Sequence, residues 1–256
     1  FRAGTLAVTL STSAQVVLKV PAIAPELSGK ITFHPSAVSG QLYAMGTVFT
    51  GGLGVEWGYK LLTGKSKLDA DDFAAIGKWS ERMKAISPGS DGLLFLPFLT
   101  GSASPYFDSL DRASWLGLST GQSRELLLHS VMEGVAFNIR ESMEWFERDG
   151  HAIDCIHLGG GGSKNDLWCQ MISDVLGKDT RRLAERDASA IGAAILAGVG
   201  AGLFASVEEA IEMTVRTEAV FSCRADRHER YSLLYEQYGK IYQALNEYYH
   251  AVRRLI

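Results

Sequence analysis

Short apolar runs alternate with polar turns through the first fifty residues of the chain. The runs are rich in branched side chains, which predicts β-strands over residues 5–10, 15–20, 30–34 and 41–48. The segment Ser-Thr-Ser-Ala at 11–14 separates the first two runs and is typical of a hairpin turn. The chain therefore opens with two predicted pairs of strands.

Beyond residue 50 the apolar period becomes that of helices, interrupted by short strands. Leu127, Val131, Val135 and Ile139 recur every four residues and predict the core-facing stripe of a helix over 123–148. Strands followed by alternating helices and strands predict an α/β fold, a mixed sheet flanked by helices, in one domain over residues 1–256. The other helices are expected up to Leu62, over 69–84, from Ser163, over 188–202, after Ser206 and over 226–253, and the other strands over 93–98, 153–158 and 178–183.

Composition narrows the class of protein. Apolar residues make up 46% of the chain and charged residues 21%, as in ordinary globular proteins, and the formal net charge of -4 argues against a nucleic-acid partner. No apolar run is long enough to predict a membrane span. The 3 cysteines form no C-x-x-C pair, which argues against a disulfide framework and favours reduced, inert thiols in a cytoplasmic protein.

Four glycines, Gly159 to Gly162, lie between a predicted strand and the helix expected to start at Ser163, with Asp166 as its capping partner. Glycine lets the backbone approach a ligand closely, and a helix N-terminus offers unpaired N–H groups and a partial positive charge. The segment predicts either an anion or nucleotide site or a tight structural turn, and composition alone does not choose. It matches neither the P-loop nor the dinucleotide-binding pattern.

Two further segments carry weaker signals. The hydroxyls of Ser11, Thr12 and Ser13 and the N–H groups of their turn can hold phosphate oxygens, although an ordinary turn is the simpler interpretation. The segment 49–57 (FTGGLGVEW) again places glycines before a helix, whose N-terminus can face the same cleft.

Other chemical patterns are missing from the sequence. The histidines show no metal-ligand spacing, there is no G-x-S-x-G segment, and paired carboxylates sit at helix starts, where they favour the helix dipole. The last predicted helix carries a stripe of tyrosines that is typical of packing rather than of a functional site. Its members are Tyr231, Tyr235, Tyr238, Tyr242 and Tyr248.

In their order and context these segments resemble the FGGY carbohydrate kinase family. VTLSTSAQVV is similar to the family's phosphate-binding hairpin, FTGGLGVEW to its glycine-rich helix start, and LGGGGSKNDLWCQMISDVLG to its adenosine motif. The segments LLFLPFLTGSASPYFDSLDRASWLGLS, LLLHSVMEGVAFNIRE and ASAIGAAILAGVGAG also match family segments, so the resemblance covers nearly the whole chain. The spacings are most similar to those of the xylulokinase members.

The resemblance implies an actin-like ATPase (ribonuclease H-like) domain that closes over ATP and Mg²⁺ against a similar N-terminal domain. Thr12 would contact the terminal phosphates, and no metal ligand is assigned to the protein. The cofactor contacts implied by the family motifs are Ser11, Thr12, Ser13, Gly52, Glu56, Gly160, Gly161 and Asn165.

The family's catalytic Asp lies shortly before the phosphate hairpin, in the other half of the protein. This chain has no Asp before Asp69, so the general base is expected upstream of Phe1 and the chain alone is not expected to phosphorylate a sugar. Two departures bear on activity: Ser11 replaces a family glycine, and Gly101-Ser-Ala-Ser-Pro105 lacks the family's Glu-Arg pair.

The activity implied by the resemblance is ATP-dependent phosphorylation of a ketopentose, D-xylulose first, to D-xylulose 5-phosphate. The alternatives left open are a kinase for another sugar or sugar acid, such as ribulose, gluconate or glycerol, and a catalytically silent nucleotide-binding member. The segments around Gly117 and Glu133 argue against an actin-like ATPase without a sugar substrate. The expected partners are the sugar and the protein's own N-terminal domain, and a homodimer is left open.

Overall fold

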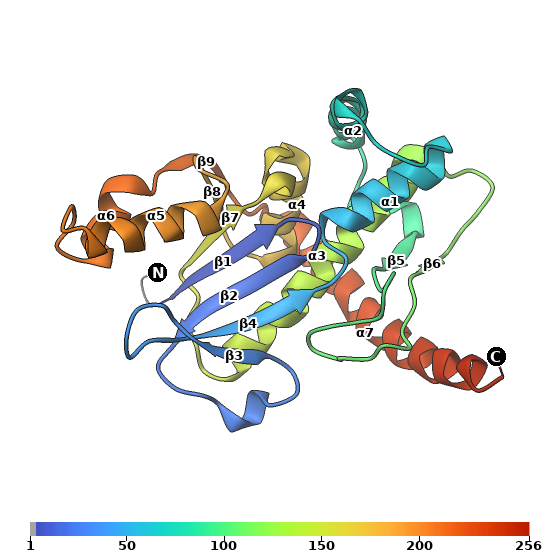
Figure 1. The fold of residues 1–256 in the computed structure, drawn as a ribbon. Coiled ribbons are helices and arrows are strands. Elements are labelled where there is room, and N and C mark those ends of the chain that lie inside the picture. Colours follow the sequence, from blue (N-terminus) through green and yellow to red (C-terminus); the bar gives the residue numbers. More distant parts are fainter. Residues whose placement is uncertain (1–3, 256) are drawn as a thin grey trace.

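A seven-stranded mixed sheet forms the centre of the computed structural model, which describes residues 4–255 (Figure 1). Its strand order is β3-β4-β2-β1-β7-β8-β9. β1 runs parallel to β7, and β7 parallel to β8, whereas the other neighbours are antiparallel. The strands are β1 (Thr5–Leu10), β2 (Ala14–Val20), β3 (Thr32–Pro35), β4 (Leu42–Val48), β7 (Cys155–Gly159), β8 (Thr180–Leu183) and β9 (Thr217–Phe221).

The first hairpin follows directly from its alternating apolar residues. Leu6 pairs with Leu18 and Val8 with Val16, so that these side chains share one face of the sheet. All four are buried, which fixes the register because a shift by one residue would turn them to the other face. The hairpin therefore ends, as the sequence predicts, in a polar tip between Leu10 and Ala14.

Helices cover one face of the sheet and extend beyond its edge. Figure 1 shows α3 running behind the sheet, with α7 beside the small two-stranded sheet of β5 and β6. The helices are α1 (Gly52–Thr63), α2 (Ala70–Met83), α3 (Arg124–Arg148), α4 (Asp166–Leu176), α5 (Ala188–Gly200), α6 (Val207–Thr214) and α7 (Ala225–Arg253). Short 3-10 turns lie at Pro25–Leu27 (η1), Ser90–Gly92 (η2) and Gly161–Lys164 (η3), and the small sheet pairs Leu94–Leu96 (β5) with Ser114–Leu116 (β6).

The long helix α3 is the core element that its apolar period predicts. Val131, Val135 and Ile139 are all fully buried. Gly134 brings α3 so close to β5 that a Cβ there would lie 2.2 Å from the carbonyl oxygen of Phe95. The helix therefore packs through both its apolar stripe and a glycine contact.

The start of α4 was predicted wrongly. Asn165, not Ser163, is the N-cap, and its side chain accepts a hydrogen bond from the Trp168 N–H. The Ser163 hydroxyl instead donates to the Gly160 carbonyl, 2.7 Å away, inside the 3-10 turn η3 that precedes α4. The expected pairing of Ser163 with Asp166 is therefore replaced by an Asn cap, which serves a helix start equally well.

The tyrosine stripe of α7 packs as predicted at most of its positions. Tyr231, Tyr238 and Tyr242 are buried, whereas Tyr248 is exposed and the adjacent Tyr249 takes the inward position. The cysteines Cys155, Cys169 and Cys223 are free thiols. Among the helices formed by residues 4–255, none combines the length and apolar character that a membrane crossing requires.

Candidate functional site

The tip of the first hairpin is joined to the start of α1 by backbone hydrogen bonds. The Gly52 N–H donates to the Ser11 carbonyl at 2.6 Å, and the N–H groups of Gly51 and Leu53 both donate to the Thr12 carbonyl at 3.0 Å. These bonds place the N-terminus of a twelve-residue helix directly against the hydroxyl-bearing tip. Two segments forty residues apart in sequence thus form one structural unit.

Glycine is required at both positions of this junction. A Cβ on Gly51 would lie 2.4 Å from the carbonyl carbon of Ser13, and a Cβ on Gly52 would lie 2.7 Å from the carbonyl oxygen of Ser11. Such contacts are far inside van der Waals distance, so any side chain would separate the helix from the hairpin. The glycines of segment 49–57 therefore serve this close approach.

The glycine turn after β7 meets the same end of the hairpin. Gly160 has a φ of +79°, and a Cβ on it would lie 2.5 Å from the Leu10 carbonyl oxygen. Its N–H donates to the Arg186 carbonyl at 2.8 Å, which ties the turn to the loop before α5. Gly161 differs from its neighbours, because a Cβ there would meet nothing within 4 Å. The turn is thus clamped at Gly160 and open at Gly161.

Polar side-chain atoms that no other described residue bonds lie around this junction. Within residues 4–255, no protein group bonds the side-chain hydroxyls of Ser11, Thr12 and Ser13, and those of Ser11 and Thr12 face solvent. Two of the buried polar atoms that lack a partner in the same part of the chain lie next to it, Thr50 Oγ1 before Gly51 and Arg186 Nε. Free hydroxyls and an open glycine turn fit a polyphosphate ligand, whereas the first N–H groups of α1 are already bonded to the hairpin carbonyls and add only the partial positive charge of the helix.

The remaining two predicted contacts are placed differently. Glu56 lies one turn into α1, half-buried, on the helix that starts at the junction. Asn165 follows the glycine turn, but its side chain is engaged: Oδ1 accepts from the Trp168 N–H, and Nδ2 donates to Ser80 Oγ on α2 at 2.7 Å. No motif in the sequence points to Ser80, Thr50 or Arg186, because only the folded chain brings them to the site.

The two departures from the family pattern have distinct structural settings. The Ser11 side chain is exposed at the hairpin tip, where it does not disturb the bond from Gly52. Ser102 and Ala103 are buried, and Ser102 closes its loop by donating its N–H to the Asp108 carbonyl at 2.9 Å. Small side chains therefore fit this loop as it stands.

The same loop is anchored to α3 by a buried carboxyl group. Glu141 accepts hydrogen bonds from the Tyr106 hydroxyl and from Asn138 Nδ2. Burial raises the pKa of Glu141 to about 8, and the two hydrogen bonds oppose this rise. At neutral pH a carboxyl with this pKa is largely protonated, because burial disfavours its charged form.

The thiol under the glycine turn is chemically inert. Cys169 is fully buried on α4, and its thiol donates to the Ser163 carbonyl at 3.2 Å. Burial raises the pKa of this thiol to about 12, so almost no thiolate exists at neutral pH. Cys169 therefore supports the turn by packing, as predicted for a buried thiol, whereas Cys155 and Cys223 are only partly buried.

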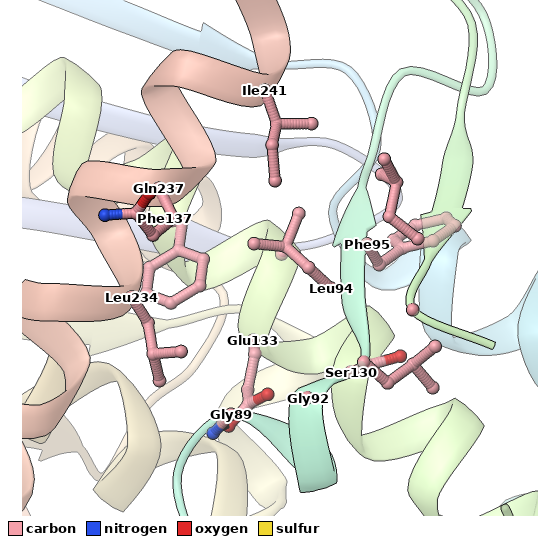
Figure 2. A pocket seen from close by; sticks show the side chains of 14 residues that line it. Gly89, Gly92, Leu94, Phe95, Ser130, Glu133, Phe137, Leu234, Gln237 and Ile241 are labelled. Atoms are coloured by element: carbon pink, nitrogen blue, oxygen red, sulfur yellow. Dashed lines mark hydrogen bonds between the residues drawn. The ribbon is translucent and has the colours of Figure 1, made fainter. Parts of the chain in front are cut away.

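A separate cavity of about 290 Å³ lies between α3, β5 and α7 (Figure 2). Its lining is mostly apolar, and its carboxyl group, Glu133, already accepts from the Gly89 N–H at 2.8 Å and from the Ser90 hydroxyl at 2.7 Å. None of the predicted nucleotide contacts lines it. The cavity is therefore distinct from the junction of hairpin, α1 and glycine turn.

Comparison with known proteins establishes the family of the chain. The model of the FGGY family of carbohydrate kinases, C-terminal domain, matches residues 1–201. The chain belongs to the FGGY family of carbohydrate kinases. It is 31% identical over 217 residues to the xylulose kinase of Bacillus subtilis, which covers 85% of this chain and 42% of that protein. It is also 31% identical over 193 residues to glycerol kinase 2 of Pseudomonas aeruginosa, covering 75% of this chain and 36% of that protein.

Solved structures of FGGY kinases share the actin-like fold. The ligand-bound xylulose kinase of Lactobacillus acidophilus aligns with a TM-score of 0.85 at 21% identity, over 98% of this chain and 49% of that one. The gluconate kinase of the same organism aligns with a TM-score of 0.84 at 23% identity, over 98% and 49%. The predicted actin-like fold is thereby confirmed, and this FGGY chain spans about half the length of the relatives it matches.

Proposed function

We propose that residues 1–256 are the nucleotide-binding C-terminal domain of an ATP-dependent sugar kinase that phosphorylates a ketopentose, D-xylulose first. The observation that carries the proposal is the junction at which the Gly52 N–H meets the Ser11 carbonyl and Gly160 meets Leu10. Names of similar proteins support the sugar class, since several of the curated relatives are xylulose kinases.

In this proposal the site binds ATP through the chain's own groups. The hydroxyls at Ser11–Ser13 and the N–H groups of Thr12 and Ser13 receive the terminal phosphates, because the Ser11 N–H is bonded to the Ser13 carbonyl. The N-terminus of α1 adds its partial positive charge. Gly160, Gly161 and Asn165 receive the adenosine part, with Gly161 leaving the open space. Bound ATP supplies the phosphoryl group, and Mg²⁺ neutralises charge on its phosphates.

The general base and most sugar contacts belong to the other half of the kinase in this account. Phosphoryl transfer depends mainly on positioning and on charge neutralisation, so a nucleotide domain without the base binds ATP but transfers little. We therefore expect residues 1–256 to bind ATP and to show no sugar-dependent turnover by themselves.

A coupled assay of the two-domain protein tests the proposal. ATP consumption should require Mg²⁺ and rise with D-xylulose more than with ribulose, gluconate or glycerol. The glycerol kinase relative and the gluconate kinase structure are the reasons to include the last two sugars. Faster turnover with one of these would reassign the substrate, and nucleotide binding without turnover on any sugar would favour a catalytically silent member.

A further inference from the structure

The carboxamide of Asn165 is held by two elements at once. Oδ1 accepts the N–H of Trp168 at 3.1 Å, which caps α4. Nδ2 donates to Ser80 Oγ, on α2, at 2.7 Å. Ser80 is 4% exposed, so water does not compete effectively for this contact. The end of the glycine turn is thereby attached to a helix that carries none of the predicted contacts.

The hydroxyl proton of Ser80 already takes part in another hydrogen bond. Its hydroxyl donates to the Ile76 carbonyl, one turn earlier in α2, at 3.0 Å. Ser80 can therefore offer Asn165 only a lone pair, while the Trp168 N–H offers only a proton. Together they fix which end of the carboxamide is the donor, and they leave one N–H of Nδ2 and one lone pair of Oδ1 free.

A carboxamide whose donor and acceptor ends are fixed is selective between purines. Adenine presents an amino donor next to a ring-nitrogen acceptor, and a carboxamide pairs with both. Guanine presents two acceptors along the same edge, so one of them would face the Asn165 oxygen. Asn165 immediately follows the turn whose Gly161 is open, and its own N–H is bonded to the Gly162 carbonyl at 3.1 Å.

We propose that Ser80 is a positioning residue that fixes the Asn165 carboxamide so that the site prefers adenine to guanine nucleotides. This inference rests on the proposed nucleotide function and assigns α2 to the same site. Ser80 does not touch the nucleotide; it acts through Asn165.

Calorimetric titration of the protein with ADP and with GDP, both with Mg²⁺, tests the role of Ser80. In Ser80→Ala the Kd for ADP should rise about five-fold, the loss expected for one hydrogen bond, while the Kd for GDP stays unchanged. The matched control is Ser173→Ala, which removes a buried hydroxyl on α4 that donates to the carbonyls of Lys178 and Phe221. This control should keep the ADP preference of the unsubstituted protein.

A second variant covers the case in which Ser80→Ala folds poorly. Asn165→Asp keeps an oxygen to cap α4 but has no N–H for Ser80 or for the base, so it should also lose the preference for ADP. Equal weakening of ADP and GDP, or no change in either, would overturn the role of Ser80. Nucleotide binding without any purine preference would overturn it as well, but would leave the proposed function standing. No nucleotide binding by the unsubstituted protein would overturn both.

Discussion

Adjacent glycines of one turn perform different tasks. Gly160 has a positive φ and lies against the Leu10 carbonyl, whereas Gly161 faces open space. The glycine turn is recognisable in the sequence, but its two tasks are not, because the difference depends on what β1 places beside each residue. Substitution of Gly160 should therefore change the stability of the protein, and substitution of Gly161 should change its affinity for the nucleotide.

We expect Gly160→Ala to destabilise the protein by at least about 1–2 kcal/mol, since its φ of +79° is strained for alanine and its Cβ would meet backbone. Gly161→Val should leave the unfolding free energy nearly unchanged and weaken ATP binding instead. Urea denaturation and nucleotide titration measure the two effects. Unchanged ATP affinity in a folded Gly161→Val protein would contradict the placement of the nucleotide.

The buried carboxyl of Glu141 predicts a pH dependence of stability. Its pKa is about 8 in the folded protein against an ordinary value of 4.5, so the folded state holds an extra proton between these values. The free energy of unfolding contributed by Glu141 therefore falls as pH rises from about 4.5 to about 8. Glu141→Gln should remove this slope and be more stable than the unsubstituted protein at pH 8.

Denaturation at several pH values between 5 and 8 checks this prediction. Glu147→Gln is the matched control, because Glu147 lies on the same helix at the surface, paired with Lys178. The control should keep the slope of the unsubstituted protein. A slope that persists in Glu141→Gln would assign the effect to other groups.

At the scale of elements, strongly periodic segments were predicted well. The first hairpin and α3 show regular apolar repeats, and both occur close to the expected residues. The edge strand β9 was missed because most of its residues are exposed, so burial imposes little pattern on it. The start of α4 was misplaced because Ser163 and Asn165 are both good caps, and only the contact of Ser163 with Gly160 decides between them.

Two glycine-to-alanine substitutions, one where α3 packs against β5 and one in α7, should change the stability of the protein in opposite directions. Gly134→Ala should lose about 2–3 kcal/mol of stability, because its Cβ would lie 2.2 Å from the Phe95 carbonyl oxygen. Gly239→Ala, in α7, should gain about 0.5–1 kcal/mol, because its Cβ meets nothing within 4 Å and alanine favours helix. Chemical denaturation of both variants measures the pair, and equal effects would contradict the close approach of α3 to β5.

At the scale of the whole molecule, we propose that the chain carries one side of a reaction site. It spans 42% of the Bacillus subtilis relative, and its polar junction offers groups for a polyphosphate but no described candidate for a sugar base. The family and fold followed from motif order along the sequence. The contact between the hairpin, α1 and the glycine turn could not be predicted in this way, because the order of motifs along the chain does not specify how close they lie in the folded protein.

Thr12→Ala is expected to weaken ATP binding without changing the stability of the protein. The Thr12 side chain is exposed and no protein group within residues 4–255 bonds its hydroxyl, so stability should change little. ATP affinity should fall about five- to ten-fold through the lost phosphate contact. Thr120→Ala, at an exposed position in a loop before α3, is the control and should bind ATP normally. Equal ATP affinities in the two variants would remove Thr12 from the site.

Hydrogen–deuterium exchange with and without MgADP tests the central claim most directly. ADP should slow exchange together at residues 11–13, 51–54 and 160–165, and leave the helix around Gln237, beside the separate cavity, unaffected. Protection in only one of these segments, or around Gln237 instead, would show that the hairpin, α1 and the glycine turn do not bind one nucleotide.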